Sequence, residues 1–334
     1  MPMGLNYYSL PPRMYDFHVI LIRPLKSILK HLVFSRSLFR LGIFGAFDEL
    51  ANRRLIWSAV DSLKPTQIDN VSSISESMPY LQICSWALEN ESVFQTFKSN
   101  TEYRAVLEHL DSAQGAEYLK LLISSSDEFT NLKFIGKRDQ CSPQKYFYPR
   151  LGRISPTQIR YAKVLQDIHL LFGSLDNLKI AEIGAGYGGQ AIHILKSDSI
   201  AEYVIYDLES PGLLAQKYIS RLPFSFKCTP VIGDFRLTSS PDLVISNYAF
   251  SELTRENQEI YLKNVLQKSN KGYVIYNHIH KDPKVSMNVF EFAETIQNAE
   301  IFEEKPLTYP GNYLVAWGHS TLNLDEKFFR RVTR

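Results

Sequence analysis

The 334-residue sequence is long enough for one large domain or two domains of ordinary size. Its formal net charge is only +2, from 37 Lys and Arg against 35 Asp and Glu, so the overall charge does not indicate a nucleic-acid partner. The three cysteines, Cys84, Cys141 and Cys228, have neither the spacing of a disulfide framework nor that of metal ligands. We therefore expect reduced thiols, a cytoplasmic location and no metal site.

Residues 1–45 are locally basic, with six Lys and Arg against Asp16. No apolar run reaches 18 residues, and Arg23 and Lys26 interrupt the run that could resemble a signal peptide, so neither a transmembrane helix nor a leader is expected. Apolar residues recur at helical spacing from about Pro24 and predict an amphipathic basic helix. Two interpretations stay open: a helix packed on the core, or one that makes weak peripheral contact with the anionic inner membrane surface.

Helical patterns continue over residues 46–64, 80–98 and 101–124, with a polar, Ser-rich linker at 66–80. None of these segments carries a recognisable chemical motif. The sequence therefore predicts a helical accessory region over residues 1–133, followed by a catalytic domain over residues 134–334.

Residues 134–173 are dense in aromatic, basic, Pro and Gly residues and precede the first predicted strand. Ser155-Pro156 is a good N-cap and first turn, and Gly173 is a good stop, so a helix is expected between them. The segment is either an ordinary surface loop or a lid over a site. As a lid, it would offer Tyr148, Arg150 and Tyr161 to bind substrate.

The stretch LKIAEIGAGYGGQAIHILKSDSIAEYVIYD, Leu178 to Asp207, organises the remainder of the chain. It is typical of a strand, a glycine turn, a helix and a second strand that ends on a carboxylate. Glycines let the backbone turn sharply and approach a ligand. Asp207, roughly 20 residues after the turn, is placed to accept hydrogen bonds from ribose hydroxyls.

Two ligands use such a turn. Gly184, Gly186 and Gly189 fit the G-x-G-x-x-G pattern of dinucleotide sites. Glu182, two residues before the first glycine, gives instead the E-x-G-x-G pattern that resembles class I S-adenosylmethionine (SAM) methyltransferases. SAM carries no phosphate, so its turn needs a carboxylate and carbonyls rather than an anion cradle. This favours SAM, and a tight turn without a ligand is the third interpretation.

Strand and helix patterns alternate after Asp207. The expected elements are a helix at 211–222, strands at 227–232 and 243–246, a helix at 251–268, a strand at 272–276, a helix at 290–298, and strands at 300–308 and 312–318. Pro310-Gly311 joins the last two strands in a turn. The pattern predicts an α/β fold of class I methyltransferase (Rossmann-like) type, with a mostly parallel seven-stranded sheet and a C-terminal antiparallel hairpin.

Five segments together suggest a family. ISPTQIRYAKVL, EIGAGYGGQ, YDLESPGLLAQKYI, SNYAFSEL and GYVIYN occur here in the order shown by a bacterial sugar O-methyltransferase family found with surface-glycan biosynthesis enzymes. The resemblance runs from about Ile135 to Asn277. It implies SAM-dependent methyl transfer to a hydroxyl of a sugar or glycan precursor, without identifying the acceptor.

Two other classes of function stay open. An NAD-dependent sugar oxidoreductase would need a Tyr/Lys or Cys pair near the nicotinamide, and no Tyr-x-x-x-Lys follows the fourth strand. The third class is a non-catalytic binding protein that keeps the methyltransferase fold. The sequence makes no prediction of oligomeric state.

Ligands of open parallel sheets lie beyond the carboxyl ends of the strands, and this rule selects the candidate residues. The methionine end is assigned to Glu182 and the glycines, the ribose to Asp207, and the adenine to Asp234 and Phe235. The complete predicted cofactor set is Glu182, Gly184, Ala185, Gly186, Tyr187, Gly188, Asp207, Leu208, Asp234, Phe235 and Asn247.

The predicted catalytic residues are His278, Glu252 and Tyr248. His278 follows the fifth strand and titrates near neutrality, so it is the first choice for a general base that takes the hydroxyl proton. Glu252 is the alternative base, and Tyr248 would line the path to the methyl group. Because His280 lies close by, His278 is equally interpreted as an ordinary loop residue. No tight Asp/Glu cluster indicates Mg²⁺.

Overall fold

The computed structural model describes residues 78–124, 126–223, 231–232, 240–277, 282–320 and 324–332. Two compact units are distinguished, Met1–Asn70 and Val71–Arg334, and every described residue belongs to the second. The predicted basic helix near Pro24, the helix at 46–64 and most of the polar linker lie outside the described residues, as do Asp234, Phe235 and His278.

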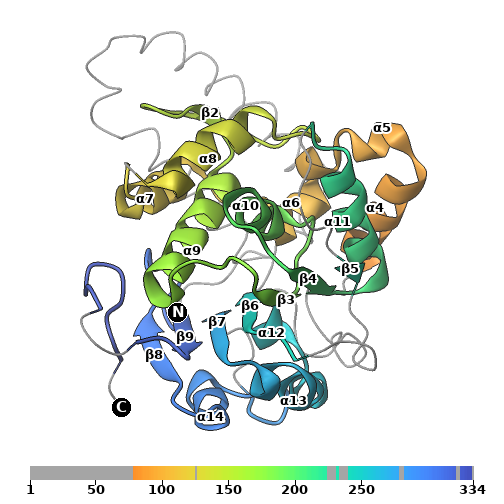
Figure 1. Ribbon diagram of the computed structural model, residues 1–334. Coiled ribbons are helices and arrows are strands. Elements are labelled where there is room, and N and C mark those ends of the chain that lie inside the picture. The colour runs from red at the N-terminus through yellow and green to blue at the C-terminus, as the bar shows by residue number, and fades with distance from the viewer. Residues whose placement is uncertain are drawn as a thin grey trace, which may run out of the picture. The chain divides into compact units, whose positions relative to one another are not determined.

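A seven-stranded sheet organises the described part of the chain (Figure 1). Its strands are β3 (Lys179–Ile183), β4 (Glu202–Tyr206), β5 (Val231–Ile232), β6 (Leu243–Asn247), β7 (Lys271–Tyr276), β8 (Glu300–Glu303) and β9 (Tyr313–Trp317). They lie in the order β5-β4-β3-β6-β7-β9-β8. Strands β3 to β7 pair in parallel, whereas β9 runs antiparallel to both β7 and β8. The mixed α/β class expected from the sequence is therefore confirmed.

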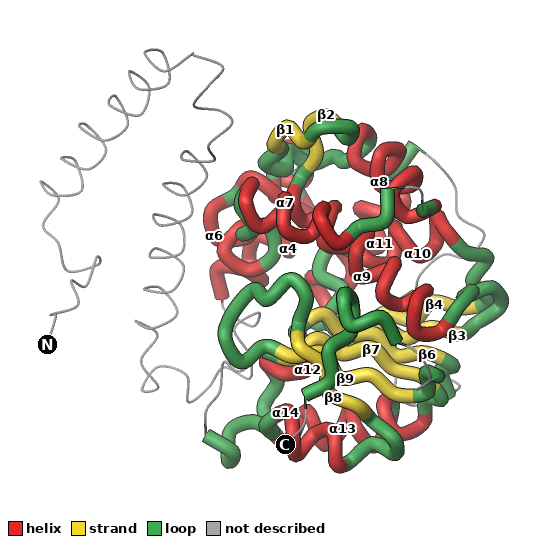
Figure 2. Tube along the Cα trace, turned by 90° about the vertical axis from the view of Figure 1, so that its left-hand side faces the viewer, coloured by secondary structure: helices red, strands yellow, loops and turns green. Residues whose placement is uncertain are grey.

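Helices cover both faces of the sheet (Figures 1 and 2). One face packs against α4 (Met78–Glu89), α9 (Pro156–Phe172), α10 (Gly189–Ser197) and α11 (Glu209–Ser220). The other face packs against α12 (Ala249–Glu252), α13 (Arg255–Asn264) and α14 (Val289–Glu294). Because strand side chains alternate, Ile180 of β3 belongs to the first core and Ala181 to the second.

An outer layer packs on the far side of α9. It consists of α7 (Ser112–Leu121), α8 (Asp127–Lys137) and the short strands β1 (Tyr146–Tyr148) and β2 (Gly152–Ile154). Three short helices, α5 (Glu91–Phe94), η6 (Phe97–Ser99) and α6 (Thr101–Val106), complete this part of the chain. Helix α9 is thus enclosed on both sides. Its predicted ends are confirmed, because Ser155 caps Thr157 and Gly173 follows the last turn.

Some predicted helices are broken where a polar side chain can begin a new one. The single helix expected at 251–268 is divided into α12, α13 and η7 (Leu266–Lys268), because the Thr254 side chain accepts from the Asn257 N–H and starts α13. Asp111 and Gln114 form a capping box that starts α7 within the expected 101–124 helix. Side-chain caps therefore begin new helices at positions where the apolar periodicity alone predicts a continuous helix.

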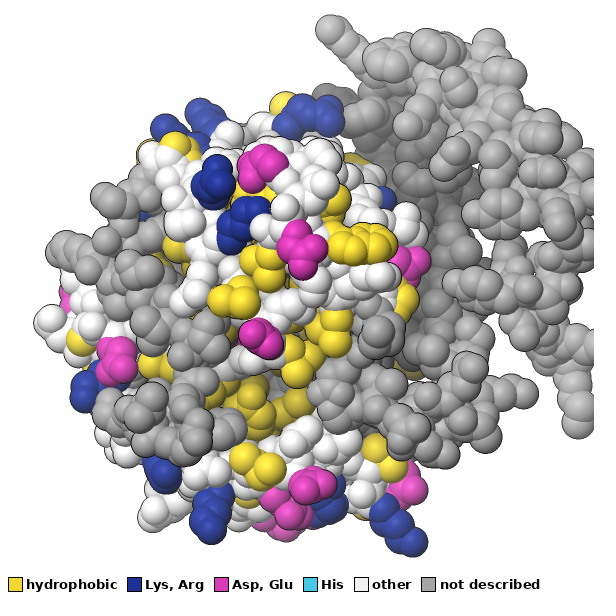
Figure 3. Space-filling view, turned by 90° about the vertical axis from the view of Figure 1, so that its right-hand side faces the viewer, with side chains coloured by type: hydrophobic (Ala, Val, Ile, Leu, Met, Phe, Trp, Pro, Cys, Tyr) yellow, Lys and Arg dark blue, Asp and Glu magenta, His cyan; other side chains and the backbone are white. Residues whose placement is uncertain are grey.

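One side of the described part of the chain carries exposed hydrophobic side chains among both basic and acidic residues (Figure 3). It is the side of α4, α5 and α11 in Figure 1, and Trp86 and Leu213 are 47% and 40% exposed. Within the described ranges, no helix combines the length and the apolar character needed to cross a bilayer.

His169 connects α9 to two acidic residues. Its Nδ1 lies 2.5 Å from Glu128 Oε1, and its Nε2 lies 2.9 Å from Asp198 Oδ2. Burial alone would lower the pKa of His169, but hydrogen bonds to Asp198 and Glu128 raise it to about 9. The doubly paired imidazolium therefore joins α8, α9 and the end of α10.

We predict that this cluster makes stability depend on pH. The folded-state pKa of His169 lies above the unfolded value of about 6.5, so protonated His169 stabilises the fold, and this stabilisation is complete below about pH 6.5. This contribution, on the order of 2 kcal/mol, should be lost as the pH rises from about 6.5 to about 9. In urea unfolding across this pH range, the free energy of unfolding of wild type should decline with rising pH, and His169→Asn should remove this decline. The control is His193→Gln, because burial lowers the pKa of His193 to about 3. An unchanged slope in His169→Asn would contradict the assignment.

Candidate functional site

Several of the residues singled out in the sequence lie at the carboxyl ends of the parallel strands. Gly184 follows β3, Asp207 follows β4, Tyr248 follows β6 and Asn277 follows β7. Because parallel strands end at the same edge of a sheet, these positions adjoin one another. Two backbone hydrogen bonds connect neighbouring strand ends. The Gly184 N–H donates to the Tyr206 carbonyl at 2.8 Å, and the Tyr248 N–H donates to the Ile275 carbonyl at 2.9 Å.

Particular positions of the turn between β3 and α10 require glycine. Gly184 and Gly186 have φ values of +74° and +55°. A Cβ on Gly184 would lie 2.0 Å from the Ala249 Cβ, and one on Gly186 would lie 2.6 Å from Leu107 Cδ1. Both conformation and space therefore require the glycines that the sequence identified.

Asp207 is directly beside this turn. Its Oδ2 accepts from the Gly186 N–H at 3.0 Å, and its Oδ1 accepts from the Leu208 N–H at 2.8 Å. Burial raises the pKa of Asp207 to about 6, although backbone hydrogen bonds from Leu208 and Gly186 oppose the shift. The half-buried side chain is thus a fixed, mainly ionised carboxylate at the edge of the sheet.

Glu182 is not at the surface of the turn but inside the core. It is only 1% exposed, and the Tyr203 hydroxyl donates to its Oε2 at 2.7 Å. Burial raises the pKa of Glu182 to about 8, while the Tyr203 hydrogen bond partly offsets the shift. At neutral pH the protonated form is therefore the larger population, and Glu182 acts as a hydrogen-bonding group within the fold.

Tyr187, in the middle of the turn, points into the core. Its ring is fully buried, and its hydroxyl accepts from Gln158 Nε2 at 3.3 Å. The Lys98 ammonium lies 3.7 Å from the ring centroid and 2.6 Å from Asp139 Oδ1. Only the backbone of Tyr187 can face a ligand. The side chain instead connects the turn to a buried cation from η6.

Asn247 and Tyr248 end β6 in an unusual conformation. Tyr248 has a φ of +71°, which is rare for a residue with a side chain and is typical of functional sites. Its hydroxyl donates to Glu304, which is 5% exposed. Asn247 Oδ1 is buried and accepts no hydrogen bond from a described residue. The edge of the sheet therefore holds an unused acceptor next to the glycine turn.

Glu252 lies between the ends of β6 and β7. Asn277 Nδ2 donates to its Oε1 at 2.8 Å, and Ser251 Oγ donates to Asn277 Oδ1 at 2.8 Å. Burial raises the pKa of Glu252 to about 7, with the Asn277 hydrogen bond acting in the opposite sense. A half-buried carboxylate with this pKa can accept a proton near neutral pH.

The three predicted substrate residues are not brought together. Tyr148 is buried in the outer layer, where its hydroxyl donates to the Ser112 carbonyl at 3.2 Å, and Arg150 is exposed in the β1–β2 turn. Figures 1 and 2 place this hairpin beyond α8, away from the sheet. Tyr161, in contrast, packs on the turn, since its Cε2 lies 2.1 Å from where a Gly189 Cβ would be.

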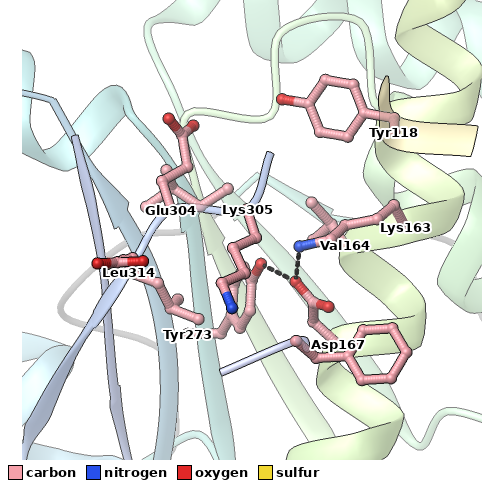
Figure 4. A pocket seen from close by; sticks show the side chains of 11 residues that line it. Tyr118, Lys163, Val164, Asp167, Tyr273, Glu304, Lys305 and Leu314 are labelled. Atoms are coloured by element: carbon pink, nitrogen blue, oxygen red, sulfur yellow. Dashed lines mark hydrogen bonds and ion pairs between the residues drawn. The ribbon is translucent and has the colours of Figure 1, made fainter. Parts of the chain in front are cut away.

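A buried polar cluster on α9 was not identified from the sequence (Figure 4). Lys163 Nζ lies 2.5 Å from Asp167 Oδ2, and the Tyr273 hydroxyl donates to the same oxygen at 2.8 Å. The Tyr118 hydroxyl and Glu304 line the same small cavity. The i,i+4 spacing of Lys163 and Asp167 was the available signal, but it is more common on exposed helices. Glu304 gave no signal, because only the tertiary fold brings it to Tyr248.

Among the described residues, no three His, Cys, Asp or Glu side chains are grouped as metal ligands would be. The carboxyl groups of Glu252 and Glu182 are instead each hydrogen-bonded to a neutral side chain, Asn277 and Tyr203 respectively.

No protein-family model matches the sequence, and no curated protein matches it. Solved structures with a similar chain path include protein 1320 of Thermoplasma acidophilum, at 13% identity and a TM-score of 0.39 over 59% of this chain and 100% of its own. Magnesium protoporphyrin IX methyltransferase of Synechocystis with bound SAM has 13% identity and a TM-score of 0.35 over 47% and 74% of the two chains. A TehB-like SAM-dependent methyltransferase of Corynebacterium glutamicum has 16% identity and a TM-score of 0.33 over 47% and 84%. With scores this low, the function has to be inferred from the residues of this chain.

We predict that the buried cation under the turn is essential for stability. Replacing Lys98 by Ala leaves the buried Asp139 carboxylate without its cation and with the Tyr218 hydroxyl as its remaining side-chain donor. This should lower the free energy of unfolding by about 3–5 kcal/mol. The control is Lys120→Ala, which removes an exposed ion pair with Glu117 and should change little. Urea unfolding of both variants is the measurement. Equal, small effects would show that Lys98 does not support the turn.

Proposed function

We propose that this chain is a SAM-dependent methyltransferase. The observation that carries the proposal is the glycine turn after β3 with the Asp207 carboxylate hydrogen-bonded to it at the end of β4. The strand order β5-β4-β3-β6-β7-β9-β8, with β9 alone reversed, supports the class I methyltransferase arrangement proposed from the sequence.

The residues at this edge suit SAM in three respects. Asp207 offers carboxylate lone pairs to ribose hydroxyls. The turn offers backbone groups at Gly184, Ala185, Gly186 and Gly188, and Leu208 offers another directly after Asp207. The unused Asn247 Oδ1 offers an acceptor for an amino group at the methionine end. Asp234 and Phe235 remain the residues proposed for the adenine.

A dinucleotide is less well accommodated. Its pyrophosphate would need the amide groups at the start of α10. Here the Tyr161 ring packs against Gly189, the first residue of that helix. The same contact is compatible with a cofactor that carries no phosphate. We therefore retain NAD only as the alternative that the binding experiment must exclude.

We further propose that the acceptor is a hydroxyl of a sugar or glycan precursor, which the resemblance to sugar O-methyltransferases implies. When bound, the cofactor supplies an electrophilic methyl group. Glu252 takes the hydroxyl proton, because its pKa of about 7 matches that of a general base near neutrality. Asn277 orients Glu252, and Tyr248 lines the approach of the acceptor. His278 remains the alternative base, and we propose no metal.

The accessory role of residues 1–133, the domain boundary near residue 133 and the weak membrane contact of the basic N-terminal segment remain predictions from the sequence, as does the cytoplasmic location.

The cofactor assignment predicts an effect of Asp207→Ala on binding. Loss of charge-assisted hydrogen bonds to the ribose should weaken S-adenosylhomocysteine binding by about 1.5–3 kcal/mol, or roughly 10- to 100-fold, in calorimetry. Wild-type affinity should also fall as the pH drops through about 6, since protonation removes an acceptor charge from Asp207. The exposed Asp127→Ala is the control. Unchanged affinity in Asp207→Ala would exclude its role, and binding of NAD but not of the SAM product would overturn the proposal.

The base assignment predicts an effect of Glu252→Gln on turnover. With SAM and sugar acceptors, kcat should fall by roughly 10²- to 10⁴-fold while SAM affinity is kept. The wild-type rate should decline as the pH falls through about 7, because the protonated carboxyl cannot accept a proton. Glu256→Gln, on the exposed side of α13, is the matched control. If Glu252→Gln keeps its kcat and His278→Ala loses it, the histidine is the base.

A further inference from the structure

Helix α9 is buried almost throughout, so each of its polar side chains needs a partner within the protein. Lys163 pairs with Asp167. Gln166 donates to the Leu121 carbonyl at 3.0 Å and accepts from the Ile123 N–H at 2.6 Å. Gln158 Oε1 pairs with His193 Nε2 at 2.8 Å. Among the charged residues in the interior of this helix, Arg160 stands apart.

Arg160 is a buried cation without a described counter-ion. The residue is only 4% exposed, and its Nε has no hydrogen-bond partner among the described residues. No carboxylate of a described residue forms an ion pair with it. Burial opposes its charge, but the neighbouring phenols of Tyr161, Tyr118 and Tyr248 keep the pKa of Arg160 above its ordinary value. The guanidinium therefore stays charged.

Such a charge is costly without an anion. A buried ion that lacks its partner destabilises a protein by several kcal/mol, and a guanidinium is well suited to carboxylate and phosphate groups through paired N–H donors. The acidic side chains in this region have other contacts. Glu304 accepts from Tyr248 and Thr308. Glu108 Oε2 accepts from Ser155, whereas Glu108 Oε1 is buried without a hydrogen bond from a described residue, and neither carboxylate forms an ion pair with Arg160. An anion from outside the described chain would complete the site.

The position of Arg160 relates it to the site at the edge of the sheet. Its Cζ lies 5.3 Å from the ring centroid of Tyr161, which packs on the glycine turn. It lies 5.9 Å from the ring centroid of Tyr248, which follows β6. The charge of Arg160 also acts on His109. Burial, together with that charge, lowers the pKa of His109 to about 4, so this imidazole contributes no second cation.

We propose that Arg160 is an anion-binding residue of the active site and that it holds a carboxylate or phosphate group of a bound ligand. This inference rests on the proposed function, and the anion has two sources. It is either the amino-acid carboxylate of the cofactor or an anionic group on the sugar acceptor. In both cases, the segment ISPTQIRYAKVL identified in the sequence supplies both the cation, Arg160, and the ring of Tyr161 that packs on the glycine turn.

The first test is the stability of the ligand-free protein. Arg160→Gln removes an uncompensated buried charge, so its melting temperature should equal or exceed that of wild type. Arg160→Lys keeps the charge but loses the planar pair of donors. Arg153→Gln, at the exposed position of β2, removes the same charge from the surface and is the matched control. A melting temperature of Arg160→Gln far below that of the control would show that Arg160 is a structural cation and would count against the proposal.

The second test uses ligands that differ in their carboxylate. S-adenosylhomocysteine carries the amino-acid carboxylate, whereas methylthioadenosine lacks it. If Arg160 holds the cofactor carboxylate, Arg160→Gln should weaken the binding of S-adenosylhomocysteine by roughly 10- to 100-fold and leave the binding of methylthioadenosine unchanged. Arg160→Lys should show an intermediate loss and decides the question if Arg160→Gln fails to fold.

The third test uses inorganic phosphate as the anionic probe. Phosphate should raise the melting temperature of wild type and of Arg153→Gln but not that of Arg160→Gln. If saturating S-adenosylhomocysteine abolishes the phosphate-induced rise in the melting temperature of wild type, the anion that Arg160 holds is the cofactor carboxylate. If the rise persists, the anion is a group of the acceptor. The proposal is overturned if Arg160→Gln changes neither the preference between the two nucleosides nor the phosphate response. If wild type binds neither nucleoside, the proposed function fails, and the phosphate response alone decides the role of Arg160.

Discussion

The close approach of four elements to the glycine turn is the constraint on which the remainder of the structure depends. A Cβ at any of four glycines in this turn would meet a side chain from a different part of the chain. These contacts are Gly184 with Ala249, Gly186 with Leu107, Gly188 with Ile219, and Gly189 with Tyr161. The turn is therefore the point at which α12, α11, α9 and the segment after α6 meet. A larger residue there would separate these elements and deform the edge of the sheet at the same time.

Burial at and beneath the carboxyl ends of these strands also shifts the pKa values of three carboxyl groups. The pKa of Asp207 rises to about 6, that of Glu252 to about 7 and that of Glu182 to about 8, in each case chiefly because the charged form is desolvated. Perturbed groups gathered at one edge of a sheet are typical of functional sites. Their different environments separate their protonation states at neutral pH: Asp207 is mainly ionised, Glu252 titrates near neutrality, and Glu182 is largely protonated.

Helix α9 contains one cation with a carboxylate partner and one without such a partner among the described residues. Lys163 has Asp167 one turn away, so its charge is compensated inside the fold. Arg160 has aromatic rings around it but no carboxylate partner among the described residues. Proteins retain destabilising groups where a ligand needs them. The contrast between two cations on one helix is the physical basis for assigning one to the fold and the other to a ligand.

The sequence by itself determined the strand–turn–helix–strand unit, because the alternation of apolar runs, the glycines of the turn and the terminal Asp207 are local signals. It also determined the ends of α9, since Ser155 and Gly173 act on their immediate neighbours. It did not determine the breaks at Thr254 and Asp111, where capping competes with periodicity. Only the tertiary structure decided that Glu182 and Tyr187 point into the core, that Tyr148 belongs to the outer layer, and that Glu304 reaches Tyr248. These facts depend on contacts between residues far apart in the chain, and no local pattern encodes such contacts.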